Sequence, residues 1–96
     1  MAAKRILIID DEQSLLESLE MYLTELGYGV ACAVTAREGL EKTASFDPHV
    51  VILDIRLPDH DGFEVLRELK QAGDERPIIM ITAFHDMDTT IRTVKL

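Results

Sequence analysis

The chain has 96 residues, of which 47% are hydrophobic, and it carries a formal net charge of −8. This length allows one small domain with a packed core rather than two domains. The negative charge argues against nucleic acid or an anionic membrane as a direct partner, because both would repel the chain. No apolar stretch approaches the roughly 20 residues that a membrane-spanning helix needs, and the N-terminus lacks the hydrophobic block of a signal peptide. A single cysteine, Cys32, cannot form an internal disulfide and is typical of a cytoplasmic protein, where we expect it to pack in the core.

The first part of the chain alternates between strand and helix patterns. Residues 5–10 are a continuous apolar run ending in an acid, which is typical of a strand buried on both faces. A helix should follow and end near Gly27, and a second strand is expected over residues 28–34. The helix is predicted from leucines that recur at helical spacing, namely Leu15, Leu16, Leu19, Leu23 and Leu26.

The middle of the chain repeats this alternation. Thr35 and Glu38 have the spacing of a capping box and predict the start of a second helix, which Asp47 and the proline after it should end. Residues 49–55 are again apolar and are expected to form a third buried strand.

The last part begins with a loop over residues 56–61. Asp61 can cap a third helix over residues 62–73, a fourth buried strand is expected over residues 76–82, and a fourth helix is expected from residue 85 onward. In the third helix the side chains expected to face inward are Phe63, Leu66 and Leu69.

Alternation at these lengths predicts an α/β fold, in which parallel strands carry helices on both faces of one sheet. Ligands of such open sheets bind at the carboxyl ends of the strands, near the point where the strand order reverses. Asp10 and Asp11 end the first strand, Asp54 ends the third and Thr82 ends the fourth. We therefore expect these four side chains to gather at one edge of the sheet.

Three neighbouring carboxylates need a compensating interaction. Two like charges about 4 Å apart cost on the order of 4 kcal/mol at an effective dielectric of 20, so either one acid is protonated or a cation lies among them. Oxygen ligands favour a hard divalent cation, with Mg²⁺ ahead of Ca²⁺ and Mn²⁺. An alternative is that the acids after the first strand only cap the next helix. Glu12 is better explained by such helix-end chemistry than as a ligand.

Three segments, "ILIIDDE", "VVILDIRLPDHDGFEVL" and "PIIMITAF", together resemble the receiver domain of two-component response regulators. The resemblance covers the whole chain, residues 1–96, as one domain. The end of the chain is most similar to receivers of the nitrogen-regulatory, enhancer-binding activators. The resemblance implies a flavodoxin-like, CheY-like doubly wound sheet in which strand and helix alternate four times and the strand order is 2-1-3-4.

The resemblance also implies a role for each residue of the site. Asp54 would accept a phosphoryl group from the phosphohistidine of a sensor histidine kinase. Mg²⁺ would be bound by Asp11, Asp54 and the main-chain carbonyl of Arg56, with Asp10 helping through water. Thr82 would bind the phosphate through its hydroxyl and act as the switch.

Two further positions of the family's pocket can be placed in the same way. Ala83 is small and would keep the pocket open. Arg56 and Phe84 would tune how fast the phosphate is lost. The resemblance thus implies a cytoplasmic regulatory domain, rather than an enzyme with its own substrate, that signals to an effector in transcription regulation.

The chain departs from the family pattern after the fourth strand. The family has a fifth strand and a fifth helix, which this sequence lacks, and Lys95 does not match the phosphate-binding lysine of the fifth strand. We expect a fragment of a longer protein, or self-association through the exposed edge of the fourth strand.

Two alternative functions remain open from the sequence. The shortened receiver could act only as a protein-binding module. A Mg²⁺-dependent phosphohydrolase of the haloacid dehalogenase type also uses an aspartate nucleophile, but its D-x-D mark is replaced by "DDE" here. Nucleotide binding is disfavoured because no glycine-rich phosphate loop follows the first strand.

Overall fold

The computed structural model describes residues 3–81 and 92–94. The longest helix in these ranges has 13 residues, and none is long and apolar enough to cross a membrane. The elements follow one another as β1 (Arg5–Ile9), α1 (Gln13–Glu25), β2 (Gly29–Ala33), α2 (Ala36–Phe46), β3 (Val50–Asp54), α3 (Gly62–Gln71), β4 (Ile78–Ile81) and β5 (Arg92–Val94).

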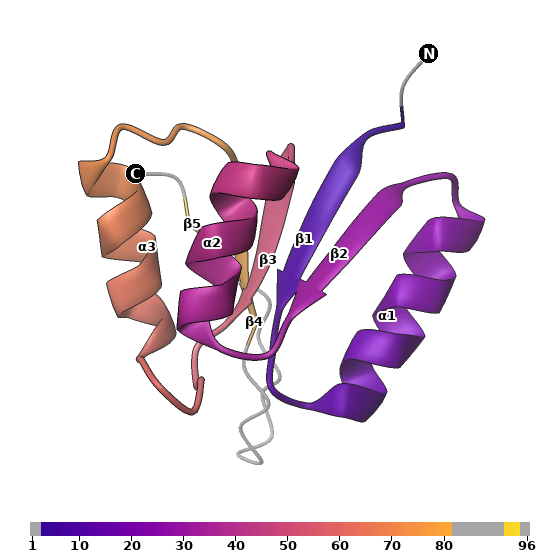
Figure 1. The fold of residues 1–96 in the computed structure, drawn as a ribbon, viewed down its shortest axis with the longest axis horizontal. Coiled ribbons are helices and arrows are strands. Elements are labelled where there is room, and N and C mark those ends of the chain that lie inside the picture. Colours follow the sequence, from indigo (N-terminus) through magenta and orange to yellow (C-terminus); the bar gives the residue numbers. More distant parts are fainter. Residues whose placement is uncertain (1–2, 82–91, 95–96) are drawn as a thin grey trace.

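The strands form one sheet in the order β2-β1-β3-β4-β5, of which the first four are parallel (Figure 1). The predicted order 2-1-3-4 is therefore confirmed. β1 lies inside the sheet, where Ile8 is level with Cys32 of β2 on one side and with Ile52 of β3 on the other. Because β1 and β3 are central neighbours that run in the same direction, the residues at their carboxyl ends come together.

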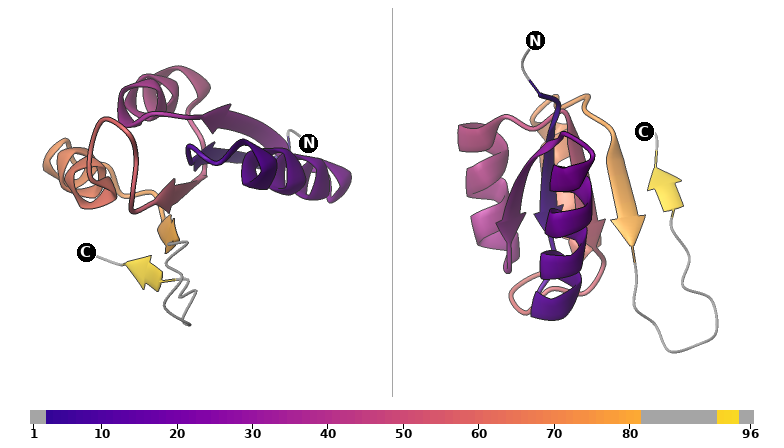
Figure 2. Two further views of the ribbon diagram at one scale, coloured as in Figure 1. Left: turned by 90° about the horizontal axis from the view of Figure 1, so that it is seen from below. Right: turned by 90° about the vertical axis from the view of Figure 1, so that its right-hand side faces the viewer.

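Helices cover both faces of the sheet, with α1 on one side and α2 and α3 on the other (Figure 2). Successive residues of a strand point to opposite faces, so Leu7 and Ile9 pack toward α2 and α3, whereas Ile6 and Ile8 pack toward α1. The side with two helices carries the larger cluster of buried side chains. This explains why the strands read as continuous apolar runs rather than as alternating patterns.

The local signals at the start of α2 and α3 are confirmed. The Thr35 hydroxyl accepts the Glu38 backbone N–H at 3.1 Å, and the Glu38 carboxylate accepts the N–H of Val34 at 2.8 Å. The Asp61 carboxylate accepts the Phe63 N–H at 2.8 Å. Both caps satisfy amides that have no partner inside their helix.

One inward-facing position was predicted wrongly. Phe63 is 42% exposed, because α3 buries Val65, Leu66 and Leu69 instead. Leu26, the last of the leucines from which the first helix was predicted, is 57% exposed and follows the end of α1 at Glu25.

The predicted fourth helix is wrong where it can be checked. Arg92–Val94 form β5, which pairs antiparallel with β4, so that Val94 is level with Ile78. The other residues of that predicted helix lie outside the described ranges. A bare edge strand presents unpaired N–H and C=O groups, and β-branched residues such as Thr93 and Val94 suit strands. Pairing with the edge of β4 therefore outweighs the local helical pattern.

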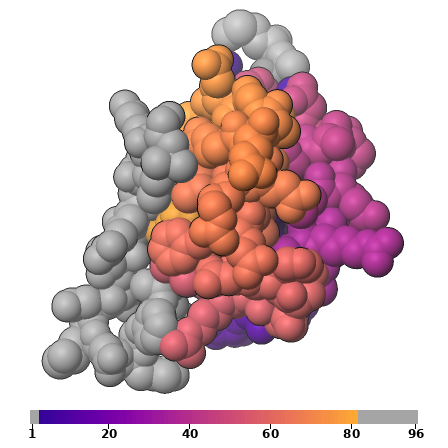
Figure 3. Space-filling model, turned by 90° about the vertical axis from the view of Figure 1, so that its left-hand side faces the viewer, coloured from indigo at the N-terminus to yellow at the C-terminus, as the bar shows by residue number. Residues whose placement is uncertain are grey.

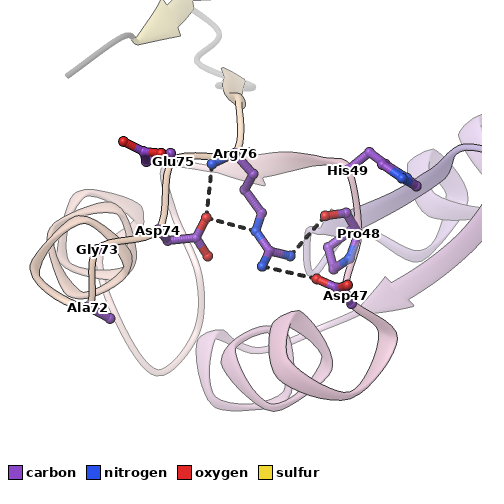
Figure 4. A pocket seen from close by; sticks show the side chains of 8 residues that line it. All are labelled: Asp47, Pro48, His49, Ala72, Gly73, Asp74, Glu75 and Arg76. Carbon is purple, nitrogen blue, oxygen red and sulfur yellow. Dashed lines mark hydrogen bonds and ion pairs between the residues drawn. The ribbon is translucent and has the colours of Figure 1, made fainter.

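α3 and the loop after it lie at the centre of the face seen in Figure 3, with α2 beside them. That loop lines an open hollow with the segment between α2 and β3, at the end of the sheet opposite to Asp54 (Figure 4). The Arg76 guanidinium joins the two segments through Asp74 at 2.8 Å and the Pro48 carbonyl at 2.9 Å. It also lies 3.4 Å from Asp47. We interpret this network as structural, because it ties the two connections together without leaving the guanidinium free for a ligand.

Candidate metal site

Three carboxylates meet at the carboxyl edge of the two central strands. Asp10 directly follows β1 and Asp54 is the last residue of β3, and both are buried, at 3% and 7% exposed. Asp11 is exposed. One oxygen from each lies within 4.8 Å of the others, and the described part of the chain contains no other such group of acids, cysteines and histidines. The gathering of Asp10, Asp11 and Asp54 that the sequence predicts is thus present in the structure.

Backbone hydrogen bonds hold the two buried acids in place. The Asp10 N–H donates to the Ala33 carbonyl at 2.9 Å, which fixes this residue against the end of β2. Its carboxylate accepts the Glu12 N–H at 2.9 Å, and the Asp54 carboxylate accepts the Arg56 N–H at 3.1 Å. The bond from the Glu12 N–H stabilises the turn before α1, but the N-cap residue Glu12 makes no side-chain cap hydrogen bond, so the helix-capping alternative is not confirmed. It leaves the burial of Asp54 beside it unexplained.

The environment of the pair opposes two negative charges. Burial raises the pKa of Asp54 to about 6, and the Arg56 N–H offsets this only in part. The negative charge of Asp10 and the side-chain hydrogen bond to it also contribute to this raised pKa. Burial also raises the pKa of Asp10. The two carboxyls therefore tend to share a proton when no cation is bound.

The donor set fits a hard divalent cation. All three side chains offer carboxylate oxygens, which Mg²⁺, Ca²⁺ and Mn²⁺ bind in proteins. Two of the acids are buried while Asp11 faces solvent, so a bound ion would keep part of its water shell, as Mg²⁺ usually does. A cation would replace the shared proton and remove the repulsion between the carboxylates.

The loop after β3 approaches Asp54 very closely at Gly62. The Gly62 N–H donates to the Ile55 carbonyl at 2.7 Å. A Cβ atom at residue 62 would overlap the Asp54 carbonyl oxygen and lie 2.8 Å from the Ile55 Cα. A bridge between Arg56 and Asp61 closes the loop. Gly62 is thus required by the packing of backbone against backbone, in addition to any role in the turn.

The remaining predicted site residues divide into two groups. Arg56 lies in the loop beside Asp54, where its N–H contacts the Asp54 carboxylate. The prediction that its main-chain carbonyl binds a metal ion is not tested by the structure. Thr82, Ala83 and Phe84 lie outside the described residues, so their predicted roles are not tested.

One residue near the site was missed from the sequence. Asp59 lies in the loop between β3 and α3, and its carboxylate accepts the backbone N–H groups of Ala36 at 2.8 Å and Arg37 at 3.1 Å. These amides begin α2 and are 23 and 22 residues away along the chain. No local pattern signals such a contact, because it exists only once the two segments meet in the fold.

The comparison with protein families decides what this domain is. Residues 6–96 match the model of the response regulator receiver domain. The chain belongs to this family. It is a receiver domain of a two-component response regulator, as its motifs indicated, and the phosphohydrolase alternative is not supported.

Named relatives agree with this assignment. The receiver domain is 44% identical over 79 residues to the response regulator MprA of Mycolicibacterium vanbaalenii, covering 82% of this chain and 34% of that protein. It is 33% identical over 94 residues to the regulatory protein AtoC of Escherichia coli, covering 98% of this chain and 20% of that protein. The chain thus spans 34% and 20% of the length of these two relatives.

Solved structures share the fold. A CheY-like receiver domain protein of Methanospirillum hungatei has a TM-score of 0.81 and 36% identity, over 88% of this chain and 68% of that chain. The response regulator TrrA of Thermotoga maritima, in complex with Mg²⁺-BeF, has a TM-score of 0.79 and 39% identity, over 85% of this chain and 71% of that chain. The predicted CheY-like architecture is therefore confirmed.

The raised pKa of Asp54 predicts how stability depends on pH without divalent cations. Between the ordinary value of 3.8 and about 6, the folded state binds more protons than the unfolded state, so the free energy of unfolding should fall as pH rises. Compared with Asp54→Asn, the wild-type chain should lose roughly 1 to 3 kcal/mol between about pH 4 and pH 7. Urea unfolding across this range measures the difference, and parallel curves for the two proteins would contradict the raised pKa.

The close approach at Gly62 predicts a cost for any side chain there. Gly62→Ala should lower the free energy of unfolding by roughly 1 to 3 kcal/mol, because the new methyl group meets the backbone of Asp54 and Ile55. Gly29→Ala is the matched control, since the nearest atom to its new Cβ is 3.7 Å away. Urea unfolding followed by circular dichroism compares them. Equal midpoints for the two variants would show that the loop can move aside.

Proposed function

We propose that this receiver domain accepts a phosphoryl group on Asp54, with Mg²⁺ as cofactor, from a sensor histidine kinase. The observation that carries the proposal is the buried Asp54 carboxylate at the end of β3, with oxygens of Asp10 and Asp11 within 4.8 Å. The solved relative TrrA in complex with Mg²⁺-BeF supports a Mg²⁺ site of this kind.

The chemistry follows from the position of Asp54. Its carboxylate would attack the phosphorus atom of a phosphohistidine, so that a P–O bond forms while the P–N bond breaks and its electron pair returns to the imidazole ring. Mg²⁺ held at this site would neutralise charge on the transferring group. The Arg56 N–H holds the attacking carboxylate, while Gly62 packs against the main chain of Asp54. Asp11, Asp54 and the main-chain carbonyl of Arg56 would bind the cation directly, with Asp10 helping through water.

The downstream part of the proposal concerns partners. Phosphorylation adds charge at the edge of the sheet and would be read by Thr82, with Ala83 and Phe84 shaping the pocket. The signal would pass to an effector domain or protein in transcription regulation, of the nitrogen-regulatory kind that the end of the sequence resembles. Residence in the cytoplasm and absence of direct nucleic-acid contacts remain predictions. Self-association through an exposed edge of β4 is no longer proposed, because β5 pairs with that edge.

Binding of Mg²⁺ should stabilise the fold. At 100 times Kd, a ligand specific for the folded state adds about 2.7 kcal/mol to the free energy of unfolding. Thermal unfolding with and without millimolar Mg²⁺ should show this shift for the wild-type chain and little of it for Asp11→Asn. Because Asp11 is exposed, the substitution should leave the fold intact. A folded wild-type protein that does not respond to Mg²⁺ would rule out the cation site.

Phosphorylation of Asp54 can be tested without the kinase. Phosphoramidate carries the same P–N bond as phosphohistidine and should transfer one phosphoryl group to the chain in the presence of Mg²⁺. Intact-mass spectrometry should detect the adduct in the wild-type protein but not in Asp54→Asn or after chelation of the cation. Binding of Mg²⁺ without any adduct would favour the alternative in which the domain only binds other proteins.

A further inference from the structure

The carboxylate of Asp59 connects two segments that are distant in the sequence. Both of its oxygens are used, one by the Ala36 N–H at 2.8 Å and the other by the Arg37 N–H at 3.1 Å. These hydrogen bonds lower the pKa of the carboxyl, the bond from Ala36 contributing most. Asp59 is therefore ionised at neutral pH, where a carboxylate at the positive end of a helix is favourable.

α2 cannot supply this cap from its own sequence. Its local capping residue, Thr35, already accepts the Glu38 N–H through its hydroxyl and the Gly39 N–H through its carbonyl. The first two backbone N–H groups of the helix, of Ala36 and Arg37, do not donate to Thr35. Asp59 accepts these two N–H groups instead. The backbone amides at the start of α2 are therefore hydrogen-bonded partly by Thr35 and partly by the loop after β3.

The same loop forms one wall of the carboxylate site. It leaves the sheet at Asp54, and the Arg56 N–H contacts the Asp54 carboxylate at 3.1 Å. The base of the loop is closed by the bridge between Arg56 and Asp61 and by the hydrogen bond from Gly62 to Ile55. Asp59 lies between the two residues of that bridge, so its two bonds to α2 hold this part of the loop, in addition to the packing of Leu57 against the core.

We propose that Asp59 is a positioning residue, which clamps the loop after β3 to the start of α2 and so holds Arg56 in the orientation that cation binding and phosphorylation at Asp54 require. The inference rests on the proposed function of that site. It adds a coupling between the two ends of the loop. A cation that orders the loop at Asp54 also strengthens the hydrogen bonds between Asp59 and α2, and these bonds in turn strengthen cation binding at Asp54.

The test compares two ways of weakening the same helix end. Asp59→Ala removes both the cap and the clamp, whereas Thr35→Ala removes a cap of α2 but leaves the clamp. Both should lower the unfolding midpoint by similar amounts. Only Asp59→Ala should weaken Mg²⁺ binding, by about tenfold as for outer residues that orient metal ligands, and slow adduct formation with phosphoramidate. Asp59→Asn, which keeps one acceptor oxygen, should fall between Asp59→Ala and the wild type.

Mg²⁺ affinity, measured by nuclear magnetic resonance titration of backbone amides, separates the outcomes. Equal Kd values for Asp59→Ala and Thr35→Ala would overturn the positioning role and leave Asp59 as a helix cap only. Absence of Mg²⁺ binding in the wild-type chain would instead be a failure of the proposed function.

Hydrogen exchange tests the coupling in the reverse direction. Mg²⁺ should slow the exchange of the Ala36 and Arg37 amides in the wild-type chain, because an ordered loop holds the clamp closed. The effect should disappear in Asp11→Asn, which keeps the clamp but loses a cation ligand. Unchanged exchange at these two amides in wild-type protein saturated with Mg²⁺ would overturn the coupling.

Discussion

The repulsion between Asp10 and Asp54 is the constraint on which the functional end of this molecule depends. Parallel pairing of β1 with β3 forces the two acids together, and burial raises the pKa of both. The fold keeps this unfavourable pair through backbone hydrogen bonds from Glu12 and Arg56. A cation that replaced the shared proton would relieve this repulsion, so the arrangement of the pair would favour binding of a positive ion.

Much of the fold could be predicted from the sequence, because the patterns that specify its strands and helix starts are local. The continuous apolar runs gave the buried parallel strands, and the Thr35 and Asp61 caps lie within a few residues of the amides that they satisfy. Arg92–Val94 were misread because a free sheet edge is a property of the assembled sheet. The exposure of Phe63 was misread for a related reason, since spacing shows which residues share a helix face but not where that face leaves the sheet.

The site could be predicted as far as strand order determines it. Asp10, Asp11 and Asp54 end neighbouring strands, and that alone brings them together. Asp59 was not recognisable, because its partners are more than 20 residues away and its own segment looks like an ordinary polar loop. The need for a glycine at residue 62 likewise depends on the assembled fold, because it arises from contact with the Asp54 backbone.

The alternation of side chains along β1 has a consequence for how the domain can change in sequence. Leu7 and Ile9 belong to a different buried cluster from Ile6 and Ile8, and the backbone of the sheet separates the two. Substitutions on opposite faces should therefore have nearly additive energetic effects, whereas those on one face compensate for each other. Buried residues in the cluster beneath α1 should therefore be replaceable with little effect on the cluster beneath α2 and α3.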